Sequence, residues 1–274
     1  MLIYIIQRFE IDSVILVGGC FLNVKANYRI LDEISGRMTV MPLSGDQGVA
    51  LGLYKLHNPE FEMPSSLCWG HRNLTRFNAP RTEFFNAMSV MSSRLDELLE
   101  SDKIVNIVWG KMEFGPRALC HTSTIAKPHA DNVNYINSIN GRSTIMPMGP
   151  VCSDGLARKI FYNIERCVKS HEYMISAFEY DQVHYAWKGV SHELPLGHGL
   201  TGRPQTIHRD HPSMDMMGKS LDNFGILINT SFNIHGVPIC CTTEQIKECV
   251  KYQTDRDTEQ RVYTLILVGD NNYE

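Results

Sequence analysis

Short apolar runs that end in glycine turns constrain the fold of this chain more than any other feature of its sequence. Residues 13–17 are Ser-Val-Ile-Leu-Val and precede Gly18-Gly19, and Ile104–Val108 precedes Trp109-Gly110. A short apolar run without alternation is typical of a strand covered on both faces, as in the parallel sheets of α/β proteins. The sequence therefore predicts an α/β fold in which residues 13–17 form a fully buried strand.

Helical and strand-like patterns alternate along the rest of the chain. We expect helices over residues 2–10, 23–34, 49–56, 84–100, 131–139 and 243–252, and further strands over residues 37–41, 172–178, 225–228 and 263–268. Thr242 and Gln245 have the spacing of a capping box at the start of the last helix. Residues 58–80 contain three prolines and no clear period. We therefore predict units at 1–60 and 81–274, joined by a connector at 61–80.

Composition and charge narrow the class of protein. The 274 residues are 43% apolar and 20% charged, which is ordinary for a packed globular protein, and the net charge is −4. This charge offers no general attraction to nucleic acid or anionic lipid, so any phosphate site must be local. No apolar run approaches the roughly 20 residues of a membrane span. We expect a cytoplasmic protein with no membrane and no general nucleic-acid partner.

Two glycine-rich segments near the N-terminus are candidates for nucleotide contact. Gly18 and Gly19 follow the first predicted strand, Asn23 follows them, and Gly48 lies at the start of the helix that begins near Asp46. Glycine permits close approach of the backbone to phosphate, and a helix N-terminus offers free N–H donors. Asp46 is a candidate metal ligand. The alternative interpretation is simple turn formation, because α/β units need such glycines in any case.

A second segment, Trp109-Gly-Lys-Met-Glu-Phe-Gly-Pro-Arg-Ala-Leu119, follows the strand at 104–108 directly. Lys111 and Arg117 are two cations on either side of a Gly-Pro turn, and together they suit a phosphate group. Glu113 could pair with either of them. The alternative is a surface cluster of ion pairs with little energetic effect.

Polar residues also end the predicted strand near residue 228. Asn229, Thr230 and Ser231 place amide and hydroxyl groups at the carboxyl end of an apolar strand, where α/β sheets usually contact ligands. An Asx turn is the alternative. Arg142 and Arg203 lie beside glycine in loops and are further candidate phosphate donors.

Taken in order, these segments resemble the O-carbamoyltransferases of nodulation and antibiotic biosynthesis. The matching blocks are residues 18–27, 45–48, 110–119, 201–206 and 227–242. The resemblance implies an α+β C-terminal domain, similar to the threonylcarbamoyl-adenylate synthases, at residues 81–274. It also implies that residues 1–60 correspond to the last part of an actin-like α/β domain.

The resemblance implies an ATP-dependent carbamoyltransferase. Carbamoyl phosphate and ATP would give carbamoyl adenylate and pyrophosphate in the C-terminal domain, with Mg²⁺ accompanying the nucleotide. The carbamoyl group would then pass to a hydroxyl of a small molecule or nucleotide, beside iron or another divalent metal in the actin-like domain. We expect a separate chain carrying the front of that domain, or a homo-oligomer, as partner.

Carried over position by position, the resemblance gives each candidate residue a role. Lys111, Arg117 and Arg142 would be catalytic phosphate ligands, Arg203, Asn229, Thr230 and Ser231 would bind the nucleotide or anhydride, Gly18, Gly19, Asn23 and Gly48 would line the actin-like nucleotide site, and Asp46 would bind metal.

Two positions depart from the pattern of the family. Thr122 and Met146 stand where arginine is usual. Each charge-assisted hydrogen bond is worth about 1.5 to 3 kcal/mol, so these changes would weaken phosphate binding. Two alternatives follow: a degenerate nucleotide-binding or assembly subunit without turnover, and a protein like the threonylcarbamoyl-adenylate synthases.

Overall fold

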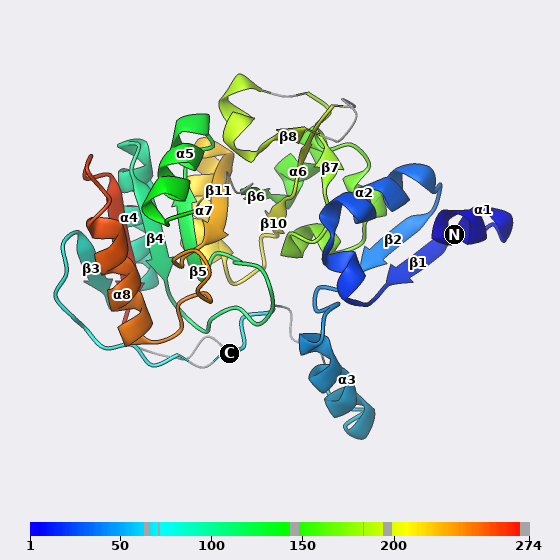
Figure 1. Cartoon of the computed structure of the whole chain (residues 1–274), viewed down its shortest axis with the longest axis horizontal. Helices are drawn as coiled ribbons and strands as arrows, with labels where there is room; N and C mark the ends of the chain where they lie inside the picture. Colours follow the sequence, from blue (N-terminus) through cyan, green and yellow to red (C-terminus); the bar gives the residue numbers. More distant parts are fainter. Residues whose placement is uncertain (63–65, 71, 143–147, 183, 194–198, 269–274) are drawn as a thin grey trace.

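A computed structural model describes residues 1–62, 66–70, 72–142, 148–182, 184–193 and 199–268 (Figure 1). Its centre is a seven-stranded sheet in the order β10-β6-β11-β5-β4-β12-β3. The strands are β3 (Thr82–Phe85), β4 (Ile104–Val108), β5 (Thr122–Ala126), β6 (Gly149–Ser153), β10 (Gln205–Ile207), β11 (Ile226–Ser231) and β12 (Val262–Leu267). The β10–β6, β4–β12 and β12–β3 pairs are parallel, and the other three are antiparallel. The sheet is therefore mixed, and the predicted α/β fold class is confirmed.

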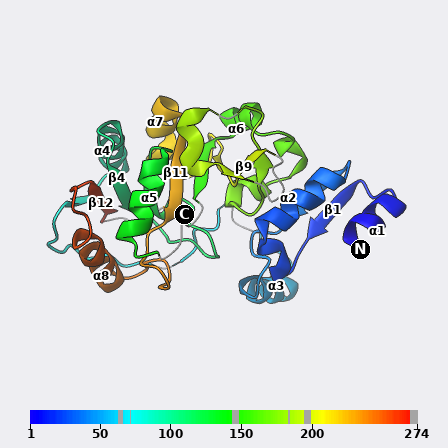
Figure 2. The same cartoon turned by 45° about the horizontal axis from the view of Figure 1, so that its top comes forward.

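Helices cover both faces of this sheet. The helices α4 (Met88–Glu100) and α7 (Met214–Phe224) pack on one face, and α5 (Ala130–Ile139) and α8 (Thr243–Thr254) pack on the other (Figure 2). Successive side chains of β11 point to opposite faces of the sheet. Leu227 therefore packs with α4 and α7, while Ile226 and Ile228 pack with α5 on the other face. The capping box of Thr242 and Gln245 is present at the start of α8, as predicted.

Between the sheet and the N-terminal segment lies a region of short elements. It contains α6 (Asp154–Ile160), η2 (Ile164–Arg166), η3 (Ser170–Tyr173), β7 (Phe178–Glu179), η4 (Tyr185–Val190), β8 (His192–Glu193) and β9 (Leu200–Gly202), with β7, β9 and β8 forming a small antiparallel sheet. The predicted strand at 172–178 is wrong except at Phe178, where β7 begins. Lys169 and Met174 have φ values of 57° and 56°, which interrupt an extended backbone on both sides of η3.

The first residues of a predicted helix also need correction. The helix expected over 84–100 begins only at Met88, because Thr82–Phe85 forms the edge strand β3 beside β12. Residues 84 and 85 are aromatic and suit a strand. Pairing with a strand about 180 positions later decides their structure, and local periodicity carries no information about it.

The N-terminal segment is a small α/β unit. It consists of α1 (Leu2–Arg8), β1 (Ser13–Leu16), η1 (Gly19–Leu22), α2 (Val24–Glu33), β2 (Arg37–Val40) and α3 (Gln47–His57), and β1 and β2 pair in parallel. The expectation that residues 13–17 are fully buried is wrong. Leu16 is 3% exposed, but Ile15 is 68% and Val17 61% exposed, since within the described residues β1 pairs with β2 alone and one of its faces is uncovered.

The N-terminal unit shares a hydrophobic core with the region of short elements. Leu16, Ile30 and Met38 belong to the same buried cluster as Cys167 and Phe178. Hydrogen bonds reinforce the contact: Asn27 Nδ2 donates to the carbonyl of Ile175 at 2.8 Å, and the Val40 N–H donates to Ser170 Oγ at 2.8 Å. The boundary near residues 61–80 stays a prediction, but the core is continuous across it.

No helix in the described ranges is long and apolar enough to cross a membrane.

Candidate functional site

Six of the candidate residues line one small hollow. Its volume is about 120 Å³, and its wall consists of Pro116, Arg117, Ala118, Arg142, Met174, Arg203, Asn229, Thr230 and Ser231. These residues come from the loop after β4, the residues after α5, the residue after η3, the turn between β9 and β10, and the end of β11. The hollow is smaller than the roughly 300 Å³ of the smallest drug-sized pockets, so by itself it suits a group of phosphate size.

The carboxyl end of β11 forms one wall. Asn229 is fully buried, and its Nδ2 donates to Gln205 Oε1 at 2.6 Å and to the carbonyl of Ala118 at 3.0 Å. Its Oδ1 is buried with no hydrogen-bond partner among the described residues. Ser231 Oγ donates to Asn233 Oδ1 at 2.6 Å. Asn229 therefore ties the strand end to the loop that carries Arg117.

Three arginines reach the hollow from three different loops. Arg142 lies 3.4 Å from Thr230 Oγ1, Arg203 Nη1 donates to the carbonyl of Met174 at 3.5 Å, and Arg117 Nη2 donates to the carbonyl of Leu22 at 3.2 Å. No aspartate or glutamate belongs to the lining, and none of the three arginines forms an ion pair within the described ranges. Three guanidinium groups without a carboxylate make a strongly positive site.

Burial makes this concentration of charge costly. It lowers the pKa of Arg117 and of Arg142, and burial together with the charge of Arg117 lowers the pKa of Arg203 to about 9. A guanidinium with this pKa is still charged at neutral pH. Buried charges without a counter-charge destabilise a fold, so an anion in the hollow would offset a cost that the protein already carries.

Lys111 is exposed and does not line the hollow. Gly18, Gly19, Asn23, Asp46 and Gly48 also lie outside its wall. Two of these have a clear local function. Asn23 caps α2 by accepting hydrogen bonds from the N–H groups of Lys25 and Ala26, and a Cβ at Gly48 would collide with the carbonyl of Leu43.

The loop after β4, which carries Arg117, also contributes to a buried polar cluster that the sequence did not indicate. The sequence allowed an ion pair between Glu113 and either Lys111 or Arg117. Glu113 forms neither pair, because its side chain points into the protein. Its Oε1 accepts hydrogen bonds from the N–H groups of Leu119, His121 and Thr122 at 2.8, 3.0 and 2.9 Å. Burial raises the pKa of Glu113, but His121, Arg72 and these N–H donors outweigh it and lower the pKa below its ordinary value.

Arg72 is the other member of this cluster that the sequence did not signal. It is 4% exposed, and its guanidinium donates to the carbonyl of Trp109 at 3.1 Å, to that of His121 at 3.4 Å, and to Thr122 Oγ1. Burial lowers the pKa of His121 to about 4, so the imidazole is neutral at pH 7. A lone arginine in an expected connector has no pattern that would indicate this position.

Metal ligands are not gathered in the part of the chain that the structure describes. No group of three or more His, Cys, Asp or Glu side chains there could hold a metal ion. Asp46 is exposed at the start of α3 and makes no side-chain cap. The metal role of Asp46 therefore stays a prediction, and these residues alone do not fit a metal site.

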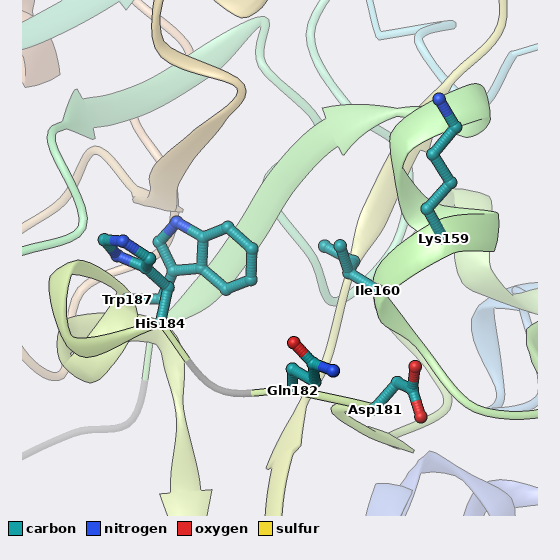
Figure 3. A pocket seen from close by; sticks show the side chains of 6 residues that line it. All are labelled: Lys159, Ile160, Asp181, Gln182, His184 and Trp187. Carbon is teal, nitrogen blue, oxygen red and sulfur yellow. The ribbon is translucent and has the colours of Figure 1, made fainter.

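A second hollow, of about 400 Å³, contains none of the predicted residues. It is lined by Lys159, Ile160, Asp181, Gln182, His184 and Trp187 (Figure 3). Trp187 and His184 lie side by side, with ring centroids 5.7 Å apart. All of the lining residues except Ile160 and Trp187 are exposed, so this is an open surface depression without the buried charge of the arginine hollow.

Comparison with known proteins completes the description of the site. The family model described as "Carbamoyltransferase C-terminus" matches residues 96–259. An uncharacterised protein of Methanocaldococcus jannaschii is 29% identical over 86% of this chain and 47% of its own length. Nodulation protein U of Rhizobium tropici is 28% identical over 81% of this chain and 38% of its own length. The 3′-hydroxymethylcephem-O-carbamoyltransferase of Amycolatopsis lactamdurans is 26% identical over 94% and 48%, respectively.

The chain thus spans about half the length of the curated relatives it matches. Among solved structures, P. abyssi Sua5 aligns over 69% of this chain and 53% of its own, at 13% identity and a TM-score of 0.42.

Proposed function

This chain belongs to the carbamoyltransferase C-terminal family, and from that membership we propose that it forms carbamoyl adenylate at the three-arginine hollow. Carbamoyl phosphate, ATP and one water would give carbamoyl adenylate, pyrophosphate and phosphate. Water would first cleave the bond between the carbamoyl oxygen and the phosphorus of carbamoyl phosphate, which releases phosphate and leaves carbamate. A carbamate oxygen would then form a bond to the α-phosphorus of ATP while the bond from that phosphorus to pyrophosphate breaks. The observation that carries the proposal is the meeting of Arg117, Arg142 and Arg203 with no carboxylate in the wall.

The residues of the hollow suit the charge changes of such a reaction. Nucleotidyl and phosphoryl transfer depend mainly on positioning and on neutralising charge at the transferring and leaving groups. Arg117, Arg142 and Arg203 would hold phosphate oxygens, and Thr230 and Ser231 would orient the nucleotide or the anhydride through their hydroxyls. No group of three or more metal-ligating side chains comes together among the described residues, and the roles assigned to this chain are those of its arginines and hydroxyls.

Thr122 bears on whether the site retains its activity, because the family pattern has arginine there. In the structure, Arg72 Nη2 donates to Thr122 Oγ1. Both side chains are buried, and neither lines the hollow. The departure at Thr122 thus lies outside the wall that Arg117, Arg142 and Arg203 form. Met146, the other departure, lies outside the described residues.

The test is release of pyrophosphate from ATP, with and without carbamoyl phosphate. We expect release that depends on carbamoyl phosphate and is lost in Arg203→Ala, while Glu97→Gln on the exposed face of α4 serves as the control. Binding of ATP without release would favour the degenerate subunit. Release that depends on bicarbonate and threonine instead would favour a threonylcarbamoyl-adenylate synthase. Either outcome would contradict the proposed reaction.

We also propose that transfer to the acceptor hydroxyl requires the front of an actin-like domain, whether in a separate chain or joined to this one. The support is the surface of the N-terminal unit, where Tyr4, Phe9, Ile15 and Val17 are each more than 60% exposed. Several exposed large apolar side chains in one small unit are what an interface with further protein would cover. The uncovered strand β1 would then pair with or pack against the added domain.

This second proposal has its own experiment. The N-terminal half of the Rhizobium tropici nodulation protein would be added to the purified chain, and metal content, co-sedimentation and carbamoylation of hydroxyl acceptors would be measured before and after. We expect association and metal binding only in the mixture, and weaker association with Ile15→Lys. Stoichiometric metal and full transfer by the isolated chain would contradict the proposal.

A further inference from the structure

The loop that carries Arg117 is held by one buried carboxylate. Residues 109–121 connect β4 to β5, which are antiparallel neighbours with Val108 opposite Thr122. Glu113 lies inside this loop, and its Oε1 accepts hydrogen bonds from the N–H groups of Leu119, His121 and Thr122. The side chain therefore closes residues 114–118 into a short ring of chain.

This closed segment contains one wall of the arginine hollow. Pro116, Arg117 and Ala118 line the hollow, and all three lie between Glu113 and the first N–H group that it binds. The carbonyl of Ala118 also accepts a hydrogen bond from Asn229 Nδ2 at 3.0 Å. Closing a short loop removes most of its conformational freedom, so Glu113 restricts the position of the Arg117 backbone, from which the side chain extends.

The backbone of the segment needs such a restraint. Gly115 has a φ of 130° and Cys120 a φ of 67°, and the second is rare for a residue with a side chain. Cys120 lies between Leu119 and His121, whose N–H groups point to the same carboxylate oxygen. Converging N–H groups of this kind need a negative acceptor, and a carboxylate makes hydrogen bonds about twice as strong as a neutral group would.

Glu113 forms no ion pair with the arginines of the hollow among the described residues. Arg72 lies on the inner side of the loop, where it donates to the carbonyls of Trp109 and His121, and the Arg72 charge helps to keep Glu113 ionised. Arg117 has no ion pair among the described residues, and its Nη2 donates to the carbonyl of Leu22. The chain thus uses one carboxylate to place Arg117 without neutralising it.

We propose that Glu113 is a positioning residue for anion binding, which acts through Arg117 by closing the 114–118 segment with three backbone hydrogen bonds. The proposal rests on the anion site of the proposed function. It assigns to Glu113 no contact with substrate. The chemistry that it serves is recognition of a phosphate group by a guanidinium fixed in place, for which pre-organisation raises affinity without adding a contact.

A double-mutant cycle with ATP as the probe tests this role. Arg117→Ala should weaken ATP binding about tenfold to a hundredfold, and Glu113→Gln should weaken it about tenfold. If Glu113 acts through Arg117, adding Glu113→Gln to Arg117→Ala causes no further loss. A general loss of folding would instead lower affinity in both backgrounds. Glu97→Gln, which also removes one carboxylate, is the matched control and should bind like the wild type.

Separate outcomes distinguish this role from the proposed function. A folded wild-type chain that binds no ATP overturns the proposed function and the role of Glu113 together. Wild-type binding with additive losses in the cycle, or with unchanged affinity in Glu113→Gln, overturns the role of Glu113 alone. If Glu113→Gln does not fold, Glu113→Asp takes its place in the same cycle, because it keeps the charge and shortens the side chain by one methylene.

Discussion

The arginine hollow holds charges without an ion pair among the described residues, whereas the N-terminal unit exposes apolar side chains. The hollow gathers Arg117, Arg142 and Arg203 without a carboxylate, whereas the N-terminal unit exposes Ile15 and Val17 on an uncovered strand. The first deficit calls for a small anion and the second for apolar protein surface. The difference suggests that nucleotide chemistry can be tested on this chain alone, while acceptor chemistry needs additional protein.

The largest effect should separate the two faces of β1. Leu16→Ala removes a side chain that is 3% exposed and should lower the free energy of unfolding by about 2 to 5 kcal/mol. Ile15→Ala removes one that is 68% exposed and should change it by less than about 0.5 kcal/mol. Urea denaturation of both variants measures this. Equal losses would mean that both faces of β1 are covered in solution.

Arg203→Met should expose the trade-off between stability and binding in the hollow. ATP affinity should fall about tenfold to a hundredfold, because one charged donor is lost. In the absence of an anion, the variant should nevertheless melt at a higher temperature than the wild type, since a partly buried charge without an ion pair among the described residues has been replaced by an apolar side chain. Calorimetry with and without ATP gives both quantities. A lower melting temperature for Arg203→Met than for the wild type without ATP would show that the wild-type fold already stabilises the charge of Arg203.

The pH dependence of stability should carry the same signature. The pKa of Arg203 is lower in the folded chain than its ordinary value, so above about pH 9 the unfolded chain binds more protons than the folded one. As the pH rises through that range, Arg203 loses its proton in the folded chain first, so the free energy of unfolding increases. Below that range Arg203 is charged in both states, and its full destabilising effect on the folded chain is present. ATP affinity should fall over the same range. Urea midpoints of wild type and Arg203→Met should converge between pH 8 and pH 10.5, and a constant difference would contradict this.

The smallest effect is expected at Lys111. Its side chain is exposed and lies outside the wall of the hollow, although the family resemblance gives it a phosphate-binding role. A solvent-exposed charge is worth about 0.2 to 1 kcal/mol, so Lys111→Ala should weaken ATP binding only a few-fold in titration calorimetry. A loss as large as that of Arg117→Ala would instead mean that the loop moves Lys111 onto the nucleotide when it binds.

Local patterns in the sequence determined much of the sheet and of the site. The strands expected at 104–108, 225–228 and 263–268 are present as β4, β11 and β12, with ends shifted by up to three residues, and the capping box starts α8 where it was expected. These signals are local, because burial, capping and turn formation depend on residues a few positions apart. The order of the motifs likewise indicated the carbamoyltransferase family, to which the chain belongs.

Only the tertiary structure decided which groups are paired. Thr82–Phe85 became a strand through pairing with β12, and residues 172–177 did not become one, because positive φ values at Lys169 and Met174 interrupt the chain. Glu113 looked like a surface partner for its neighbours but binds three backbone N–H groups, and Arg72 reaches Thr122 across 50 positions. Burial and long-range contact determine the ionisation and orientation of such side chains, and neither quantity can be read from their spacing along the chain.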